Sequence, residues 1–185
     1  MSNFDARHRL AVSYIYQLPA GSGQRLLGNA RGFANLLVSG WQLAGITTLQ
    51  SGWPFTVFTS QDISNTGSSN DRPNLIGDPN LPRDQRSVDR WFNTAAFQLA
   101  DRGTFGNLGR NTLTAPGINN WDFSLIKNTR ISEGKNLQFR AEVFNIANHP
   151  QFASPNRDAS SAQFGRIFST AVFSRQIQLG LKLIY

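Results

Sequence analysis

The last eleven residues, 175–185, constrain the fold of this chain more than any other segment. Apolar side chains recur there at every second position: Ile177, Leu179, Leu181, Leu183 and Tyr185. Because successive side chains of a strand point to opposite faces, these five would form one apolar face and the mostly polar residues between them the other. The length matches the roughly 9–11 residues with which a tilted strand crosses a bilayer. The pattern is typical of a transmembrane β-strand, although the last strand of a soluble sheet could also produce it.

Four earlier segments show the same alternation. The predicted strands therefore cover residues 8–18, 38–59, 120–130, 136–147 and 174–185 approximately. A bulge or bend at residues 51–54 is expected to interrupt the second of them. Residues 132–135 form a short turn that contains glycine, so the third and fourth strands are expected to make a hairpin. The sequence predicts an all-β fold, an antiparallel meander of long amphipathic strands.

Two long stretches, about 60–119 and 148–173, lack this periodicity. They are rich in asparagine, aspartate, glycine and proline, which favour turns. Long loops of this kind are uncommon in compact domains and typical of the external side of outer-membrane barrels. Within the first stretch, residues 91–97 are expected to form a short helix or an apolar plug that anchors the loop. Its carboxylates lack the spacing of a calcium-binding loop, so a solvated loop is expected.

Composition excludes several classes of protein. No apolar run approaches the ~18 residues of a membrane helix, and cysteine is absent, which excludes disulfides and thiolate metal sites. The net charge is +7, but the arginines are scattered through the chain, so nucleic-acid binding is not expected. Residues 1–8 do not resemble a signal peptide, and an export signal is expected upstream of this chain.

The sequence predicts no catalytic residue, no cofactor and no metal site, and we do not expect an enzyme. Its two histidines, His8 and His149, are far apart and no nucleophile elbow is present. The polar strand faces carry the residues expected to line a lumen: Asp122, Gln138, Arg140, Glu142 and Lys182. We expect Arg140 and Glu142 to pair across strands with Asp122 or Lys127. A merely solvated polar face is an equally good interpretation.

Five strands are too few for a closed barrel, which needs about eight and usually an even number. Either the long loops hide three weak strands, or this chain is the carboxyl-terminal part of a larger barrel. We favour the second explanation.

Several phrases together resemble one family. They are FDARHRL (4–10), GWQLAGI (40–46), LQSGWPF (49–55), WFNTAAF (91–97), FRAEVFNIANHP (139–150) and the tail to Tyr185. In combination they are similar to the carboxyl-terminal barrel region of Oar-like TonB-dependent receptors, outer-membrane transporters that often carry a carboxypeptidase-regulatory-like domain. The resemblance implies a barrel of about 22 strands in the bacterial outer membrane, of which this chain would form the final part.

The resemblance also implies partners. These are outer-membrane lipid, the barrel-assembly machinery, and the remainder of the parent barrel with its plug. The plug and the TonB box of the family have no counterpart in these residues, so TonB is expected to act only through the full-length parent. Leu179, Leu181, Leu183 and Tyr185 would be the signal that the assembly machinery reads.

Two alternatives remain open from the sequence. One is a soluble all-β binding module, such as a sandwich, that uses its long loops for carbohydrate or protein contacts. The other is a small complete outer-membrane barrel acting as an anchor or adhesin.

Overall fold

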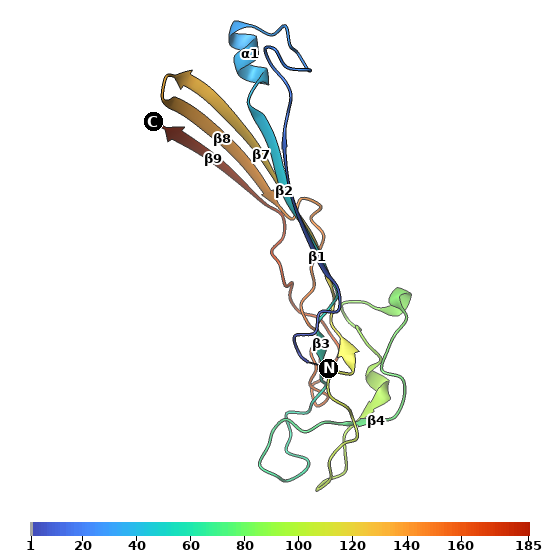
Figure 1. The fold of residues 1–185 in the computed structure, drawn as a ribbon. Helices are drawn as coiled ribbons and strands as arrows, with labels where there is room; N and C mark the ends of the chain where they lie inside the picture. The colour runs from blue at the N-terminus through green and yellow to red at the C-terminus, as the bar shows by residue number, and fades with distance from the viewer. Residues whose placement is uncertain (1) are drawn as a thin grey trace. The chain divides into compact units, whose positions relative to one another are not determined.

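A five-stranded sheet is the largest element of the computed structural model, which describes residues 2–185 (Figure 1). Its strands are β1 (Arg9–Gln17), β2 (Trp41–Gln50), β7 (Ile118–Ser132), β8 (Lys135–Phe144) and β9 (Gln176–Ile184), and one helix, α1 (Gly32–Val38), lies between β1 and β2. The strands are neighbours in the order β1-β2-β7-β8-β9, which is their order along the chain. The sheet is therefore a meander, and the predicted all-β fold class is confirmed.

The ladders of this sheet are antiparallel. β8 pairs with β9 so that Leu137 faces Leu183 and Ala141 faces Leu179, and β7 pairs with β8 so that Leu125 faces Ala141. In the β1–β2 pair, Leu18 N–H donates to Trp41 O at 2.9 Å near one end, and Ser51 N–H donates to His8 O at 2.9 Å near the other. These bonds fix which side chains share a face across the sheet.

The remaining elements are short. They are β3 (Pro54–Phe55), β4 (Asn74–Leu75), β5 (Phe97–Gln98), β6 (Leu113–Thr114) and the 3₁₀ helices η1 (Arg83–Gln85) and η2 (Thr94–Ala96). β3 pairs with β6 and β4 with β5, each as a separate two-stranded sheet. Among the described residues the long connections thus add no strand to the main sheet, and the idea that they hide three further barrel strands is wrong.

The chain divides into two compact units. The loop unit comprises Met1–Arg9, Gln50–Ile118 and Gln151–Val172, and the sheet unit comprises Leu10–Leu49, Asn119–Pro150 and Phe173–Tyr185. Both long connections thus belong to the same unit. No helix of residues 2–185 is both long enough and apolar enough to cross a membrane.

The strand predicted over 38–59 is wrong in its extent. Val38 still belongs to α1, β2 ends at Gln50, and only two residues of β3 follow. Gly40 has a φ of 75° and lies directly against the backbone of Asn128, so it begins the strand with a sharp turn. At the other end, Gly52 lies against the Ala115 carbonyl, and Pro54 has no N–H to continue the ladder.

An aromatic cluster forms the core of the loop unit. The Phe92 ring centroid lies 5.8 Å from that of Phe55, 5.7 Å from that of Phe97 and 5.1 Å from that of Phe164. Phe92 and Leu108 are only 2% and 1% exposed. The stretch 60–119 is therefore a packed structure, not a solvated loop. Residues 91–97 do anchor it, through Phe92 and the single turn η2.

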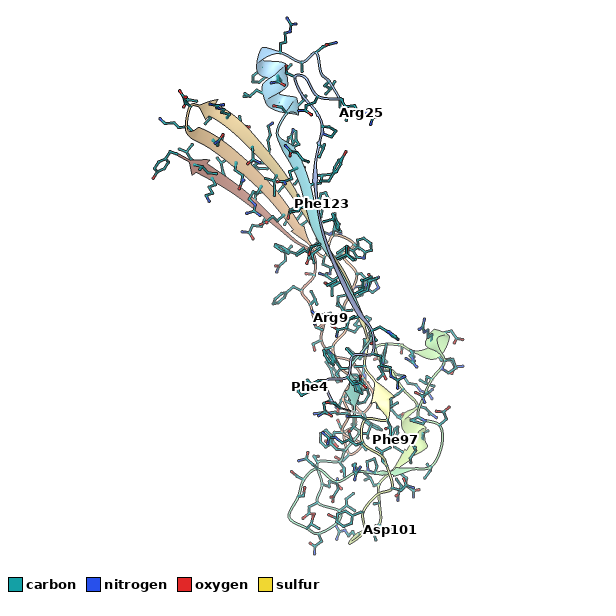
Figure 2. The ribbon with its side chains drawn as sticks, viewed as in Figure 1. Phe4, Arg9, Arg25, Phe97, Asp101 and Phe123 are labelled. Atoms are coloured by element: carbon teal, nitrogen blue, oxygen red, sulfur yellow. The ribbon has the colours of Figure 1, made fainter. Side chains whose placement is uncertain are left out.

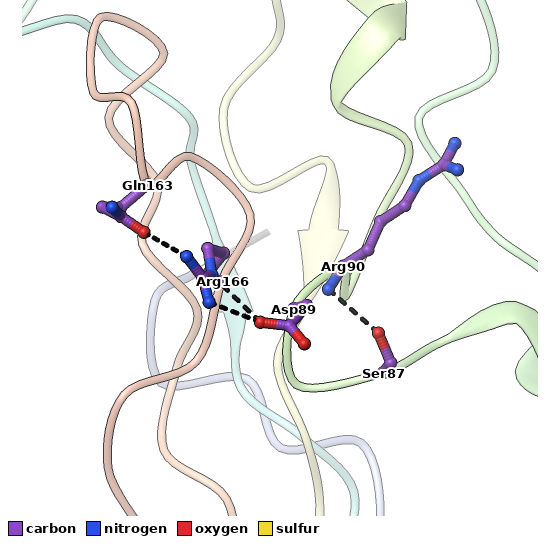
Figure 3. Close-up of polar contacts among 5 residues, drawn as sticks. All are labelled: Ser87, Asp89, Arg90, Gln163 and Arg166. Carbon is purple, nitrogen blue, oxygen red and sulfur yellow. Dashed lines mark hydrogen bonds and ion pairs between the residues drawn. The ribbon is translucent and has the colours of Figure 1, made fainter.

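Polar contacts join the two long connections within the loop unit. Arg166 Nη2 donates to Asp89 Oδ1 at 2.6 Å, and Arg166 Nη1 donates to Gln163 Oε1 at 2.7 Å (Figure 3). Backbone bonds reinforce this: Ile167 N–H donates to Val88 O at 2.7 Å, and Phe58 N–H to Arg157 O at 3.1 Å. Two loops that appear independent in the sequence therefore fold together.

Candidate functional site

The first functional feature is a continuous apolar face of the sheet unit. The face consists of four rows of side chains, each of which crosses β7, β8 and β9 in that order. The rows are Phe123, Val143 and Ile177; Leu125, Ala141 and Leu179; Lys127, Phe139 and Leu181; and Thr129, Leu137 and Leu183. Leu179 and Leu181 are 68% and 70% exposed. Contiguous apolar surface of this kind is rare on soluble monomers and marks a site where a membrane, a protein or a ligand binds.

Lys127 is the one charged side chain in these rows. Its Nζ donates to Ser39 O at 2.6 Å and lies 5.0 Å from the ring centroid of Trp41. The aliphatic part of the side chain can therefore remain on the apolar face while the charge is held by a carbonyl and an aromatic ring at the end of the sheet.

The apolar face continues onto β1 and β2. The β1–β2 register places Tyr14 opposite Gly45, and the Tyr14 ring lies where a side chain at position 45 would be. A tyrosine thus covers the gap that glycine leaves in the sheet. Leu10, Val12 and Tyr16 alternate with Tyr14 on the same face of β1 and are exposed.

The opposite face is mostly polar, although it also carries Ile15, Ile46, Ile126 and Ile184. The residues predicted to line a lumen all have the alternation of this face: Asp122 in β7, Gln138, Arg140 and Glu142 in β8, and Lys182 in β9. Gln138 lies between Asn128 and Lys182 in one row, and its Nε2 donates to Asn128 Oδ1 at 2.8 Å. The structure thus brings these residues onto one surface.

The predicted cross-strand pairing of Arg140 and Glu142 is wrong. The register sets Arg140 opposite Ile126 and Glu142 opposite Ser124, so neither meets a charge on β7. Arg140 Nη2 instead contacts Glu142 Oε1 at 3.1 Å, along the same strand. Lys127 lies on the other face and is out of reach.

Asp122 has a local structural contact as well as its place on the polar face. Its Oδ1 accepts the N–H of Asn145 at 2.9 Å. Asn145 is buried, with a φ of 50°, and its Nδ2 donates to the carbonyls of His149 and Phe173. Sequence reasoning missed this asparagine, which holds the turn after β8. The only sequence signal for this role is the residue type itself, because asparagine tolerates the left-handed backbone conformation better than most residues.

The carboxyl-terminal strand is an edge of the sheet. Within residues 2–185, β9 has a neighbouring strand on one side only, β8, and Tyr185, one residue beyond β9, is 94% exposed. The residues predicted as an assembly signal, Leu179, Leu181, Leu183 and Tyr185, are therefore all accessible on this edge strand.

Two carboxylates of the loop unit, Asp62 and Asp71, cap turns. Asp71 accepts hydrogen bonds from the N–H of Ser64 at 2.7 Å and from its hydroxyl at 3.0 Å, and the backbone N–H bond is the main reason why the pKa of Asp71 is lowered. Asp62 accepts the N–H groups of Thr66 and Gly67. In residues 2–185, three or more histidine, aspartate or glutamate side chains nowhere gather as a metal site would require.

Three arginines from distant parts of the sequence line one concavity of the loop unit. The concavity has a volume of about 340 Å³, and Arg72, Arg110 and Arg157 are in its lining with Phe58. The Arg157 guanidinium lies 5.4 Å from the centroid of the Phe58 ring. Sequence reasoning missed this basic surface because its members are separated by tens of residues.

Comparison with known proteins identifies one family. A family model described as an outer membrane beta barrel domain matches residues 1–178. No curated protein and no solved structure matches the chain.

Proposed function

This chain belongs to the outer membrane β-barrel domain family, and from that premise we propose that it is the carboxyl-terminal wall segment of a TonB-dependent outer-membrane receptor. Family membership implies the bacterial outer membrane as its location. In the proposal, the apolar face of the sheet contacts lipid and the polar face lines the lumen through which a solute enters. The phrases that resemble Oar-like receptors support the finer assignment.

One observation carries the proposal: the exposed apolar face lies on an antiparallel meander whose other face is mostly polar. Fully burying a leucine side chain is worth about 1.5–3 kcal/mol, so a row of exposed leucines on β9 would be strongly unfavourable in water. Lipid removes this cost without a second protein layer. The sandwich alternative would need that second layer over the leucines of β9, which remain exposed.

The two edges of the sheet support a larger barrel. β1 and β9 each have one neighbouring strand among the described residues, and each unpaired backbone group in a bilayer costs several kcal/mol. We therefore propose that further strands of the parent barrel pair with both edges. The assembly machinery would act on β9, and TonB would act through the plug of the full-length parent.

Matched arginine substitutions on β9 test the lipid-facing assignment. Leu179→Arg places a charge on the apolar face and should cost about 2–4 kcal/mol if the residue lies near the bilayer midplane. Gln178→Arg places the same charge on the polar face one residue away and should have little effect. The measurement is the amount of folded, heat-modifiable protein in outer membranes of cells that express the complete gene. Equal folding of the two variants would overturn the assignment.

Binding to TonB tests the finer part of the proposal. The complete gene product should bind the periplasmic domain of TonB in a pull-down. A barrel that folds normally but does not bind TonB would contradict the receptor assignment, and it would leave the assignment of the sheet to the barrel wall unaffected.

A further inference from the structure

We propose that the connection between β1 and β2, centred on α1, is a membrane-surface anchor that inserts its apolar side chains into the phospholipid leaflet at that end of the sheet. This proposal rests on the lipid-facing sheet described above and adds a second contact with the membrane, outside the strands.

The connection exposes an unusual concentration of apolar side chains. Within twelve residues it carries Leu26, Leu27, Phe33, Leu36 and Leu37, all exposed, and Phe33 is 74% exposed. The helix α1 buries none of its residues. Isolated exposed apolar residues are normal, but a cluster of five in one connection indicates a surface that is covered by something apolar.

Two side chains attach the end of α1 to the apolar side of the sheet. Trp41 Nε1 donates to Leu37 O at 2.8 Å, and Lys127 Nζ donates to Ser39 O at 2.6 Å. Lys127 belongs to the apolar rows, and Trp41, whose ring it contacts, shares that face. The connection is thus held beside the face that meets lipid, and its exposed side chains extend that face beyond the strands.

The connection is a built structure with a defined shape. Ser22 N–H donates to Asn35 Oδ1 at 2.6 Å, Gly21 N–H to Leu26 O at 3.0 Å, and Leu26 N–H to Pro19 O at 2.9 Å. Gly21 has a φ of 116°, and a Cβ there would lie 2.6 Å from Ser39 Cβ. These contacts join the loop to α1 through Asn35 and Ser39, and they leave Phe33 and Leu36 exposed.

Charge also fits a phospholipid surface. Arg25 and Arg31 are the only charged residues of the connection, and the sequence has no acidic residue between Asp5 and Asp62. Figure 2 shows Arg25 in this connection, beyond the end of β1. Exposed apolar residues flanked by arginine are the composition of segments that lie in a membrane interface, where the arginines meet phosphate groups.

Depth-dependent quenching tests the proposal, and the absence of cysteine from this chain makes labelling simple. A fluorophore is attached to Phe33→Cys in the complete gene product, with any cysteine elsewhere replaced by serine, and the protein is refolded into phospholipid vesicles that contain nitroxide lipids. Gln24→Cys, an exposed polar position of the same connection, is the matched control. Leu181→Cys reports whether the sheet itself meets lipid.

We expect the label at position 33 to be quenched by lipid at a depth of about 5–10 Å below the headgroups, and the label at position 24 to be quenched much less. Quenching at 181 with no difference between 33 and 24 would overturn the anchor and leave the lipid-facing wall intact. Absence of quenching at 181 as well would overturn both proposals.

Discussion

The two units of this chain differ in where they place their apolar side chains. In the loop unit, Phe92 and Leu108 are almost completely enclosed by the same chain. In the sheet unit, no other part of the chain covers Leu179 and Leu181 among the described residues, and both side chains stay exposed. The hydrophobic effect acts in both, but the apolar environment is a small aromatic core in one unit and, as we propose, lipid in the other. In this proposal the sheet unit depends on a bilayer to cover its apolar face, whereas the loop unit carries its own core.

The largest effect should come from removing the core of the loop unit. Phe92→Ala deletes the ring that contacts three other phenylalanine rings, and it should destabilise that unit by about 3–5 kcal/mol. Limited proteolysis of the complete gene product in outer membranes should then cut within residues 60–117, while the strands remain protected. Phe105→Ala is the control, since Phe105 belongs to the same unit but is exposed. Equal sensitivity of the two variants would mean that the aromatic cluster does not hold the loop unit.

Acid should loosen the loop unit before the sheet. The pKa of Asp71 is lowered in the folded state, mainly by the Ser64 N–H, from an unfolded value of about 3.9. Its stabilising contribution is therefore complete above that value and is lost as the pH falls toward the lower folded pKa. After correction for the intrinsic exchange rate, the protection of amides near residues 62–72 should decrease as the pH falls below about 3.9.

Asp71→Asn provides the matched control for this pH dependence. The amide cannot ionise, so the variant should exchange faster at neutral pH and show a smaller change on acidification. If both proteins respond equally to acid, another carboxylate controls the opening of this segment.

The smallest effect should come from the surface ion pair that joins the two long connections. Arg166 and Asp89 keep 44% and 68% of their side-chain surface exposed, so their coupling should be below about 1 kcal/mol and should fall with salt. A double-mutant cycle with Arg166→Gln and Asp89→Asn measures it through the protease sensitivity of the loop unit. A larger, salt-independent coupling would show that the pair, and not the aromatic core, joins the loops.

The partners of the polar side chains could not be predicted from the sequence. Alternation assigned Arg140 and Glu142 to one face, but not their partners, because a shift of register by one or two residues changes every cross-strand neighbour. Asn145 gave no signal beyond its residue type, since its importance depends on the carbonyls of His149 and Phe173 that fold back onto it. The arginines around Phe58 converge only through the folding of the loop unit.

The sequence by itself determined the five long strands and their two faces, although not the extent of the second strand, because the alternation of side chains is a local property of an extended backbone. It also determined that the chain forms an antiparallel meander with long connections. Only the tertiary structure decided that these connections fold together, since Phe55, Phe92 and Phe164 come from three distant segments without any common period. Long-range packing depends on which segments meet, and no local pattern records that.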